Sequence, residues 1–101
     1  MTIISEYNQR QLNLLKKFID DYEKGNITLP LLISNIEGLL TALENFPPKQ
    51  HNELVSKWGV LEEIHSICLD ENNRPLNLYE KDTIDQVLLE LQKLCSSLIR
   101  R

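Results

Sequence analysis

The stretch that decides the fold runs from Gly25 to Phe46 and reads Gly-Asn-Ile-Thr-Leu-Pro-Leu-Leu-Ile-Ser-Asn-Ile-Glu-Gly-Leu-Leu-Thr-Ala-Leu-Glu-Asn-Phe. Its apolar residues recur at steps of three and four, which is the period of a buried helical face. The residues on this face are Leu29, Leu32, Ile33, Ile36, Leu39, Leu40 and Leu43. The pattern predicts an amphipathic helix whose apolar side the other segments of the chain must cover.

Local signals on both sides set the ends of this helix. Gly25 can take the positive φ that ends a preceding helix. Thr28 is a good N-cap, and Pro30 falls in the first turn, where no backbone donor is needed. The pair Pro47-Pro48 disfavours helical angles in the residue before it. We therefore predict a helix over residues 29–45.

Gly38 interrupts this helix in its middle, where glycine costs about 1 kcal/mol relative to alanine. The expected reason is the close approach of a neighbouring helix or ring, and a kink in the helix is the alternative. Gly59, in the next helical segment, suggests close packing in the same way.

Three further segments carry the helical period. We expect them to run from about residue 5 or 8 to 24, from 51 to 70, and from a capping box at Asn77 and Glu80 to about Ile99. Their apolar stripes include Leu12, Leu15, Phe18, Ile19 and Tyr22 in the first, Leu54, Trp58, Leu61, Ile64 or His65 and Cys68 in the next, and Ile84, Val87, Leu88, Leu91, Leu94, Cys95 and Leu98 in the last.

Short polar links separate the helices, so neighbours along the chain should be antiparallel. The predicted fold class is all-α, a small antiparallel bundle of about four helices in a single domain over residues 1–101, with residues 1–7 frayed. Val55, Val60, Ile67 and Leu69 should widen the inward side of the third helix, and Trp58 should anchor the core.

Composition narrows the class of protein. The chain has 101 residues, 42% hydrophobic and 26% charged, which is ordinary for a globular domain. It contains no apolar run of the roughly 20 residues that span a bilayer, and its first residues lack the basic and apolar parts of a signal peptide. We therefore expect a cytoplasmic protein with reduced cysteines and no membrane partner.

Charge is unevenly distributed along the chain. Residues 1–17 carry a net charge of +2, residues 18–71 a net charge of −7, and residues 72–101 a net charge of +1. A concentrated acidic block argues against nucleic acid as a partner, because nucleic-acid binding needs a basic surface. The block suits a basic protein partner, and simple solubility is the alternative explanation.

The sequence offers few candidates for chemistry. His51, His65, Cys68 and Cys95 could be drawn as a zinc site or a Cys/His nucleophile pair, but both cysteines lie on apolar stripes and no paired ligand motif is present. Buried cysteines acting as small hydrophobes are the favoured interpretation. We expect no metal, no cofactor and no enzymatic activity; Glu62-Glu63 point about 100° apart on a helix and do not converge on one substrate.

Two segments together resemble a known group of proteins. They are Tyr22-Glu23-Lys24-Gly25-Asn26-Ile27-Thr28-Leu29, continued by Ile36-Glu37-Gly38-Leu39-Leu40-Thr41-Ala42-Leu43-Glu44, and Trp58-Gly59-Val60-Leu61-Glu62-Glu63-Ile64 with Cys68-Leu69-Asp70-Glu71. The pattern resembles small helical bacterial proteins found beside toxin genes, including immunity proteins of contact-dependent growth inhibition systems. The resemblance covers about residues 12–95.

The resemblance implies a cytoplasmic antidote that binds and blocks the C-terminal domain of one cognate toxin, often a nuclease with a basic cleft. The matching positions are Glu37, Glu44, Trp58, Glu62, Glu63, Asp70 and Glu71, of which the acidic ones are the expected partner-binding residues. For Trp58 and Glu37 a role in the fold is the alternative. A different class of function, a small helical adaptor or structural protein that self-associates, also remains open.

Overall fold

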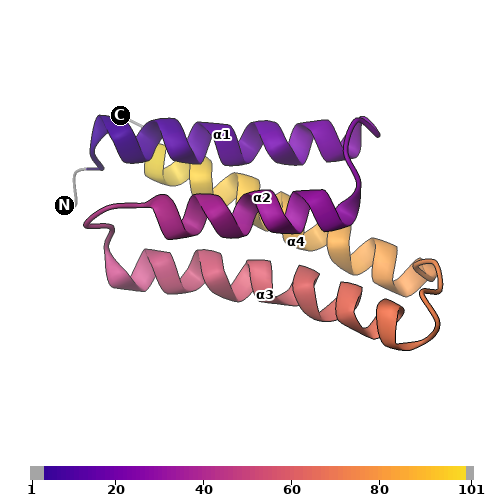
Figure 1. Cartoon of the computed structure of the whole chain (residues 1–101). Coiled ribbons are helices and arrows are strands. Elements are labelled where there is room, and N and C mark those ends of the chain that lie inside the picture. The colour runs from indigo at the N-terminus through magenta and orange to yellow at the C-terminus, as the bar shows by residue number, and fades with distance from the viewer. Residues whose placement is uncertain (1–3, 100–101) are drawn as a thin grey trace.

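The computed structural model describes residues 4–99, which form four α-helices and their connections (Figure 1). The helices are α1 (Glu6–Glu23), α2 (Leu29–Ala42), α3 (Pro48–Asp70) and α4 (Leu78–Ile99). Over residues 4–99 the chain forms no β-strand. The prediction of an all-α bundle of about four helices is confirmed.

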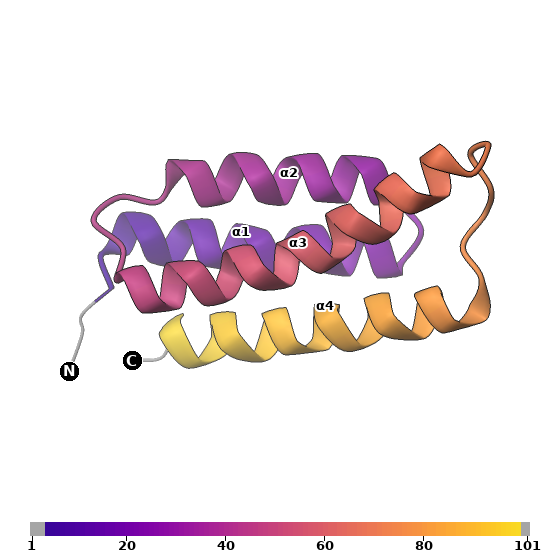
Figure 2. The same cartoon turned by 90° about the horizontal axis from the view of Figure 1, so that it is seen from below.

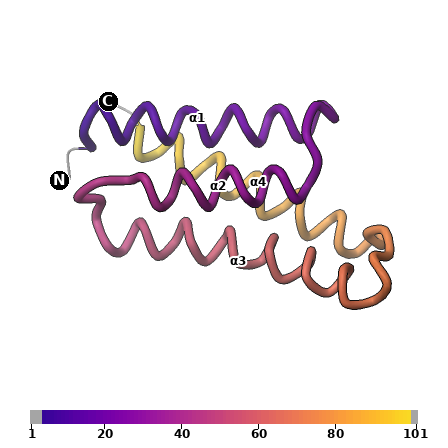
Figure 3. Tube along the Cα trace, viewed as in Figure 1, coloured from indigo at the N-terminus to yellow at the C-terminus, as the bar shows by residue number. Residues whose placement is uncertain are grey.

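The helices run alternately in opposite directions and form a closed ring (Figures 1 and 2). α2 packs against α1 and α3, and α4 packs against α3 and α1, so each helix has two neighbours. The tube in Figure 3 shows how short the links between them are. The result is an elongated bundle of 45 × 25 × 20 Å in which α1 begins and α4 ends at the same end.

The core lies on the axis of this ring and contains the stripes that the sequence predicts. All four helices contribute side chains that are less than 2% exposed, namely Leu12, Leu15, Ile19, Leu32, Ile36, Leu54, Leu61, Ile84, Leu88, Leu91 and Cys95. Burying a leucine or isoleucine side chain contributes about 1.5–3 kcal/mol, so this cluster supplies most of the driving force for folding.

The inward side of α3 is narrower than predicted. Val55, Ile67 and Leu69 are 36%, 39% and 50% exposed, whereas we expected them to widen that side. The physical reason is that α3 meets only α2 and α4, and these two helices cover one side of it. A part of the apolar surface of α3 therefore remains accessible to solvent or to a partner.

α2 ends at Ala42, three residues before the predicted end at Asn45. The reason is a pair of hydrogen bonds from α1 to the backbone that follows α2. The Asn8 side chain donates from Nδ2 to the Glu44 carbonyl at 2.7 Å and accepts from the Glu44 N–H at 3.0 Å. These bonds hold residue 44 outside the helix, and Asn45 takes a φ of +51°. The proline pair is therefore not what ends α2.

α3 begins at Pro48 and not near His51, as predicted. Pro47 is the N-cap, with a φ of −56° and a ψ of 127°, and Pro48 occupies the first position of the helix. Proline suits that position because its fixed φ is helical and its missing N–H would have no partner there. The pair Pro47-Pro48 thus starts a helix.

The N-terminal segment is more ordered than the predicted fraying implies. Ile4 is 7% exposed, and the Ser5 hydroxyl caps α1 by accepting from the Asn8 N–H at 3.1 Å. Glu6 and Tyr7 already belong to α1. Residues 1–3 of the predicted frayed segment lie outside the described residues.

The glycines divide into two kinds. Gly25 has a φ of +81°, which confirms its predicted role at the end of the first helix. A Cβ added to Gly38 or Gly59 would meet no heavy atom within 4 Å. The expected close approach of a neighbouring group at these two positions is therefore wrong, since both face open space.

Candidate partner-binding surface

The six carboxylates predicted to bind a partner are all exposed, but the structure does not bring them into one cluster. They are Glu37 on α2, Glu44 in the following link, Glu62, Glu63 and Asp70 on α3, and Glu71 directly after α3. The carboxylates differ in their neighbouring residues, and these neighbours show which carboxylates lie beside a pocket.

Glu37 lines a pocket between α2 and α3 with a volume of about 140 Å³. The other lining residues are Leu40, Thr41, His51, Val55 and Trp58. Small-molecule sites usually start at about 300 Å³, so this pocket has the size for a single side chain.

Trp58 forms one wall of the pocket and is half-buried, packed against the core without lying inside it. Its indole Nε1–H donates to the Ile33 carbonyl of α2 at 3.0 Å. The prediction of a core anchor is therefore met only in part. The bond fixes the ring between the two helices and leaves other atoms of the ring along the pocket.

His51 closes the end of the pocket that lies near the start of α3. Its Nε2 is 3.3 Å from the Leu40 carbonyl oxygen, and its ring meets Phe46 edge-on at 6.4 Å between centroids and an interplanar angle of 66°. The sequence presents His51 only as a candidate metal ligand. Its role as a wall of a pocket depends on the packing of α3 against α2, for which the sequence carries no local signal.

Glu62 extends the same surface, whereas Glu63 and Asp70 point elsewhere. Glu62 follows Trp58 by four residues and so lies one turn further along the side of α3 that meets α2. Its carboxylate accepts from Ser66 at 3.3 Å. Glu63 is turned about 100° further round the helix, and Asp70, seven residues later, shares its direction away from the core.

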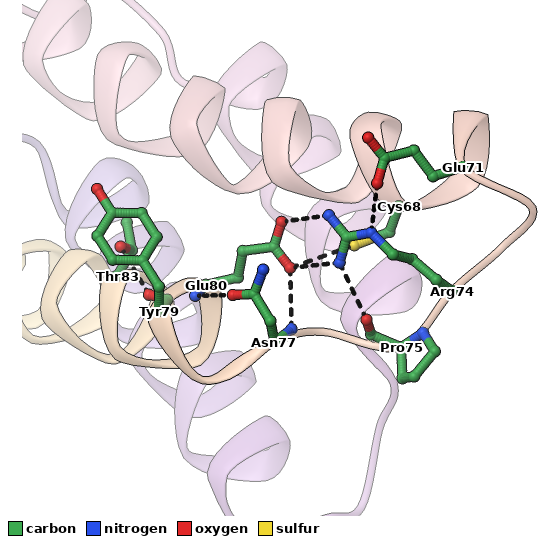
Figure 4. A network of polar contacts seen from close by, with 8 residues as sticks. All are labelled: Cys68, Glu71, Arg74, Pro75, Asn77, Tyr79, Glu80 and Thr83. Atoms are coloured by element: carbon green, nitrogen blue, oxygen red, sulfur yellow. Dashed lines mark hydrogen bonds and ion pairs between the residues drawn. The ribbon is translucent and has the colours of Figure 1, made fainter.

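Glu71 belongs to a network at the link between α3 and α4 (Figure 4). Arg74 donates from Nε to Glu71. Its two terminal nitrogens donate to the two oxygens of Glu80, and both of these bonds are 2.8 Å long. The predicted capping box is confirmed, because Asn77 Oδ1 accepts from the Glu80 N–H at 2.8 Å and Glu80 accepts from the Asn77 N–H at 3.0 Å. Glu71 is thus already paired within the chain.

The electrostatics of this network are those of a structural ion pair. Hydrogen bonds from Arg74, and then from the Asn77 N–H, lower the pKa of Glu80 to about 2 although burial acts in the opposite direction. The Cys68 thiol donates to Glu80 at 3.7 Å, and burial raises its pKa. A thiol with a raised pKa is a poor nucleophile.

The candidate metal ligands are not brought together. His51 and Cys68 lie 17 residues apart on α3, about 25 Å along the helix. Cys95 is in the core, where burial raises its pKa to about 12. Residues 4–99 contain no group of three or more His, Cys, Asp or Glu side chains placed to hold a metal ion.

Among residues 4–99, none of the four helices combines the length and the apolar character that a membrane crossing requires. Comparisons of the chain with protein-family models, with curated proteins and with solved structures found no match.

Proposed function

We propose that this protein is a cytoplasmic inhibitor that neutralises the C-terminal domain of a cognate bacterial toxin by binding it. The binding surface is acidic, the partner presents a basic surface such as a nuclease cleft, and no reaction is catalysed. The proposal rests on the resemblance to immunity proteins and on the state of the carboxylates of α2 and α3.

The observation that carries the proposal is that these carboxylates are exposed and lack cationic neighbours. Over residues 29–71 the chain has seven acidic and two basic side chains, and Lys57, one of the two, pairs with Glu90 of α4 at 2.8 Å. Among the described residues, no lysine, arginine or histidine forms an ion pair with Glu37, Glu62, Glu63 or Asp70.

Unpaired like charges on the surface of a protein repel one another, and a cationic partner reduces that repulsion. Such a surface also accelerates association with a basic protein through long-range attraction. By contrast, several carboxylates elsewhere are paired within the chain, including Asp20, Asp21, Glu80 and Glu90. The unpaired carboxylates of α2 and α3 are therefore available to pair with cations of another protein.

The test begins with capture of partners from the source bacterium on the tagged chain, followed by mass spectrometry. We expect a toxin whose C-terminal domain, once purified, binds the chain in a one-to-one complex and loses its activity. The association rate should fall as salt is added, because ions screen exposed charges. A complex whose association rate is independent of salt, or a toxin domain that stays active when saturated with the chain, would contradict the proposal.

A second candidate function, self-association as an adaptor, is favoured by a different surface. α1 and α2 enclose a groove of about 280 Å³ lined in part by Leu14, Phe18 and Leu39. Leu14 is 40% exposed, and Leu31 on α2 is 46% exposed. Sedimentation equilibrium of the purified chain decides between the two functions, since an adaptor of this kind forms dimers or larger species without any toxin.

A further inference from the structure

Two hydrogen-bond donors in the lining of the pocket between α2 and α3 already have partners within the chain. The Trp58 indole N–H donates to Ile33, and the Thr41 hydroxyl donates to the Glu37 carbonyl at 3.0 Å. His51 places Nε2 against the Leu40 carbonyl at 3.3 Å. The Glu37 carboxylate forms no hydrogen bond within the described residues, and Trp58 adds an aromatic ring to the lining.

A site with a free carboxylate and an aromatic ring favours a ligand that carries N–H donors and a positive charge. Arginine is such a ligand, since its guanidinium has five N–H donors, no acceptor and a permanent positive charge. The guanidinium also stacks on aromatic rings, and its aliphatic stem suits the apolar walls provided by Leu40 and Val55.

We propose that this pocket receives one arginine side chain of a partner protein, with its stem between Leu40 and Val55 and its guanidinium against Trp58 and Glu37. The inference rests on the proposed function and adds the position on the acidic surface at which a partner side chain is bound. Glu62, one turn beyond Trp58, adds negative charge on the approach to the pocket. Single arginine side chains in central pockets commonly carry much of the binding energy of an interface.

The competing occupants differ from arginine in chemistry. A neutral polar side chain lacks the charge that Glu37 attracts, and an acidic side chain is repelled by Glu37. A lysine ammonium has the charge but cannot stack in the same way or bind a carboxylate through two parallel bonds. The pocket should therefore rank arginine above lysine, and both above a neutral analogue of arginine.

The experiment uses the full chain and small probes, so it does not depend on finding the toxin. The ¹⁵N-labelled protein is titrated with N-acetyl-arginine amide, with the lysine equivalent, and with the citrulline equivalent, which is a neutral analogue of arginine. Trp58 is the single tryptophan in the sequence, so the indole N–H resonance and the fluorescence report directly on the pocket.

We expect saturable shifts of the Trp58 indole and of backbone amides around residues 37–41 and 51–58 with the arginine probe, with affinity on the order of millimolar for a contact this small. Citrulline amide should produce no saturable shift. Glu37→Gln should weaken arginine binding about two- to fivefold, the range for an exposed ion pair, while Glu63→Gln, an equal loss of charge outside the pocket, should change it little.

Equal binding of the arginine and citrulline probes would overturn the proposal, as would equal weakening by Glu37→Gln and Glu63→Gln. These outcomes are separate from failure of the proposed function. If the chain binds arginine amide in the pocket but binds no toxin, the pocket proposal is supported and the proposed inhibitor function is contradicted. If the chain neutralises a toxin but its pocket does not bind arginine amide, the inhibitor function is supported and the arginine-pocket proposal is contradicted.

Discussion

At the scale of single residues, the Glu80 carboxylate is held by several hydrogen bonds in a nearly buried position. It is 8% exposed and accepts from both terminal nitrogens of Arg74, from the Asn77 N–H and from the Cys68 thiol. A buried charge is tolerated only when it is paired and hydrogen-bonded, and these partners fulfil that condition. The network joins the end of α3 to the start of α4 (Figure 4).

The lowered pKa of Glu80 predicts a specific loss of stability in acid. The pKa is about 2 in the folded protein against an ordinary value of 4.5, so the stabilisation is fully present above pH 4.5. It is lost as the pH falls from 4.5 towards 2, because the unfolded chain binds the proton more readily than the folded one. The measurement is the free energy of unfolding in urea at several pH values for the parent and for Glu80→Gln.

We expect Glu80→Gln to be less stable than the parent at neutral pH and to lose less stability between pH 4.5 and 2. The matched control is Glu63→Gln, which removes an exposed carboxylate from α3 and should follow the parent at every pH. If the parent and Glu80→Gln lose stability in parallel over this range, Glu80 does not have the lowered pKa that its hydrogen bonds require.

At the scale of elements, the two kinds of glycine predict opposite effects of substitution by alanine. Gly38→Ala should raise the free energy of unfolding by about 0.5–1 kcal/mol, since alanine is the better helix former and its Cβ meets open space. Gly25→Ala should lower it by about 1–2 kcal/mol, because φ at this position is +81°. Urea unfolding followed by circular dichroism measures both changes.

Gly59→Ala provides the internal control for Gly38→Ala, because both glycines lie inside helices and face open space. The two variants should be stabilised by similar amounts. A destabilised Gly38→Ala would show that α2 relies on flexibility or on a close contact that the arrangement of the four helices does not reveal.

At the scale of the whole molecule, the distribution of charge predicts which face meets a partner. Glu62→Lys should weaken toxin binding more than Glu63→Lys, because Glu62 lies on the side of α3 that carries the pocket and Glu63 points about 100° away. Both variants should fold normally, since exposed charges contribute little to stability. The double reversal of Lys81 and Lys93 to glutamate on α4 is the control and should have a small effect.

The measurements for this prediction are toxin affinity and growth protection at two ionic strengths, with melting temperature as the check on folding. If the α4 reversals abolish protection while Glu62→Lys and Glu63→Lys bind like the parent, the interface lies on α4. The acidic surface of α2 and α3 would then serve solubility.

Features that depend on residues close together in the chain can be predicted from the sequence alone. The apolar period of residues 29–43, the cap at Thr28, the turn at Gly25 and the capping box of Asn77 and Glu80 all appear where the sequence predicts them. Each involves groups within about one or two helical turns, so the local geometry of the backbone sets the contact whatever the rest of the molecule does.

Contacts between residues far apart in the chain follow from the packing of the helices and not from local sequence. Asn8 binds the backbone of Glu44 and shortens α2. The pocket beside Glu37 exists because α3 turns Trp58 and His51 towards α2. These contacts depend on which sides of neighbouring helices meet, and that is fixed by packing of the whole core, because a helical period identifies an apolar side without specifying the partner that covers it.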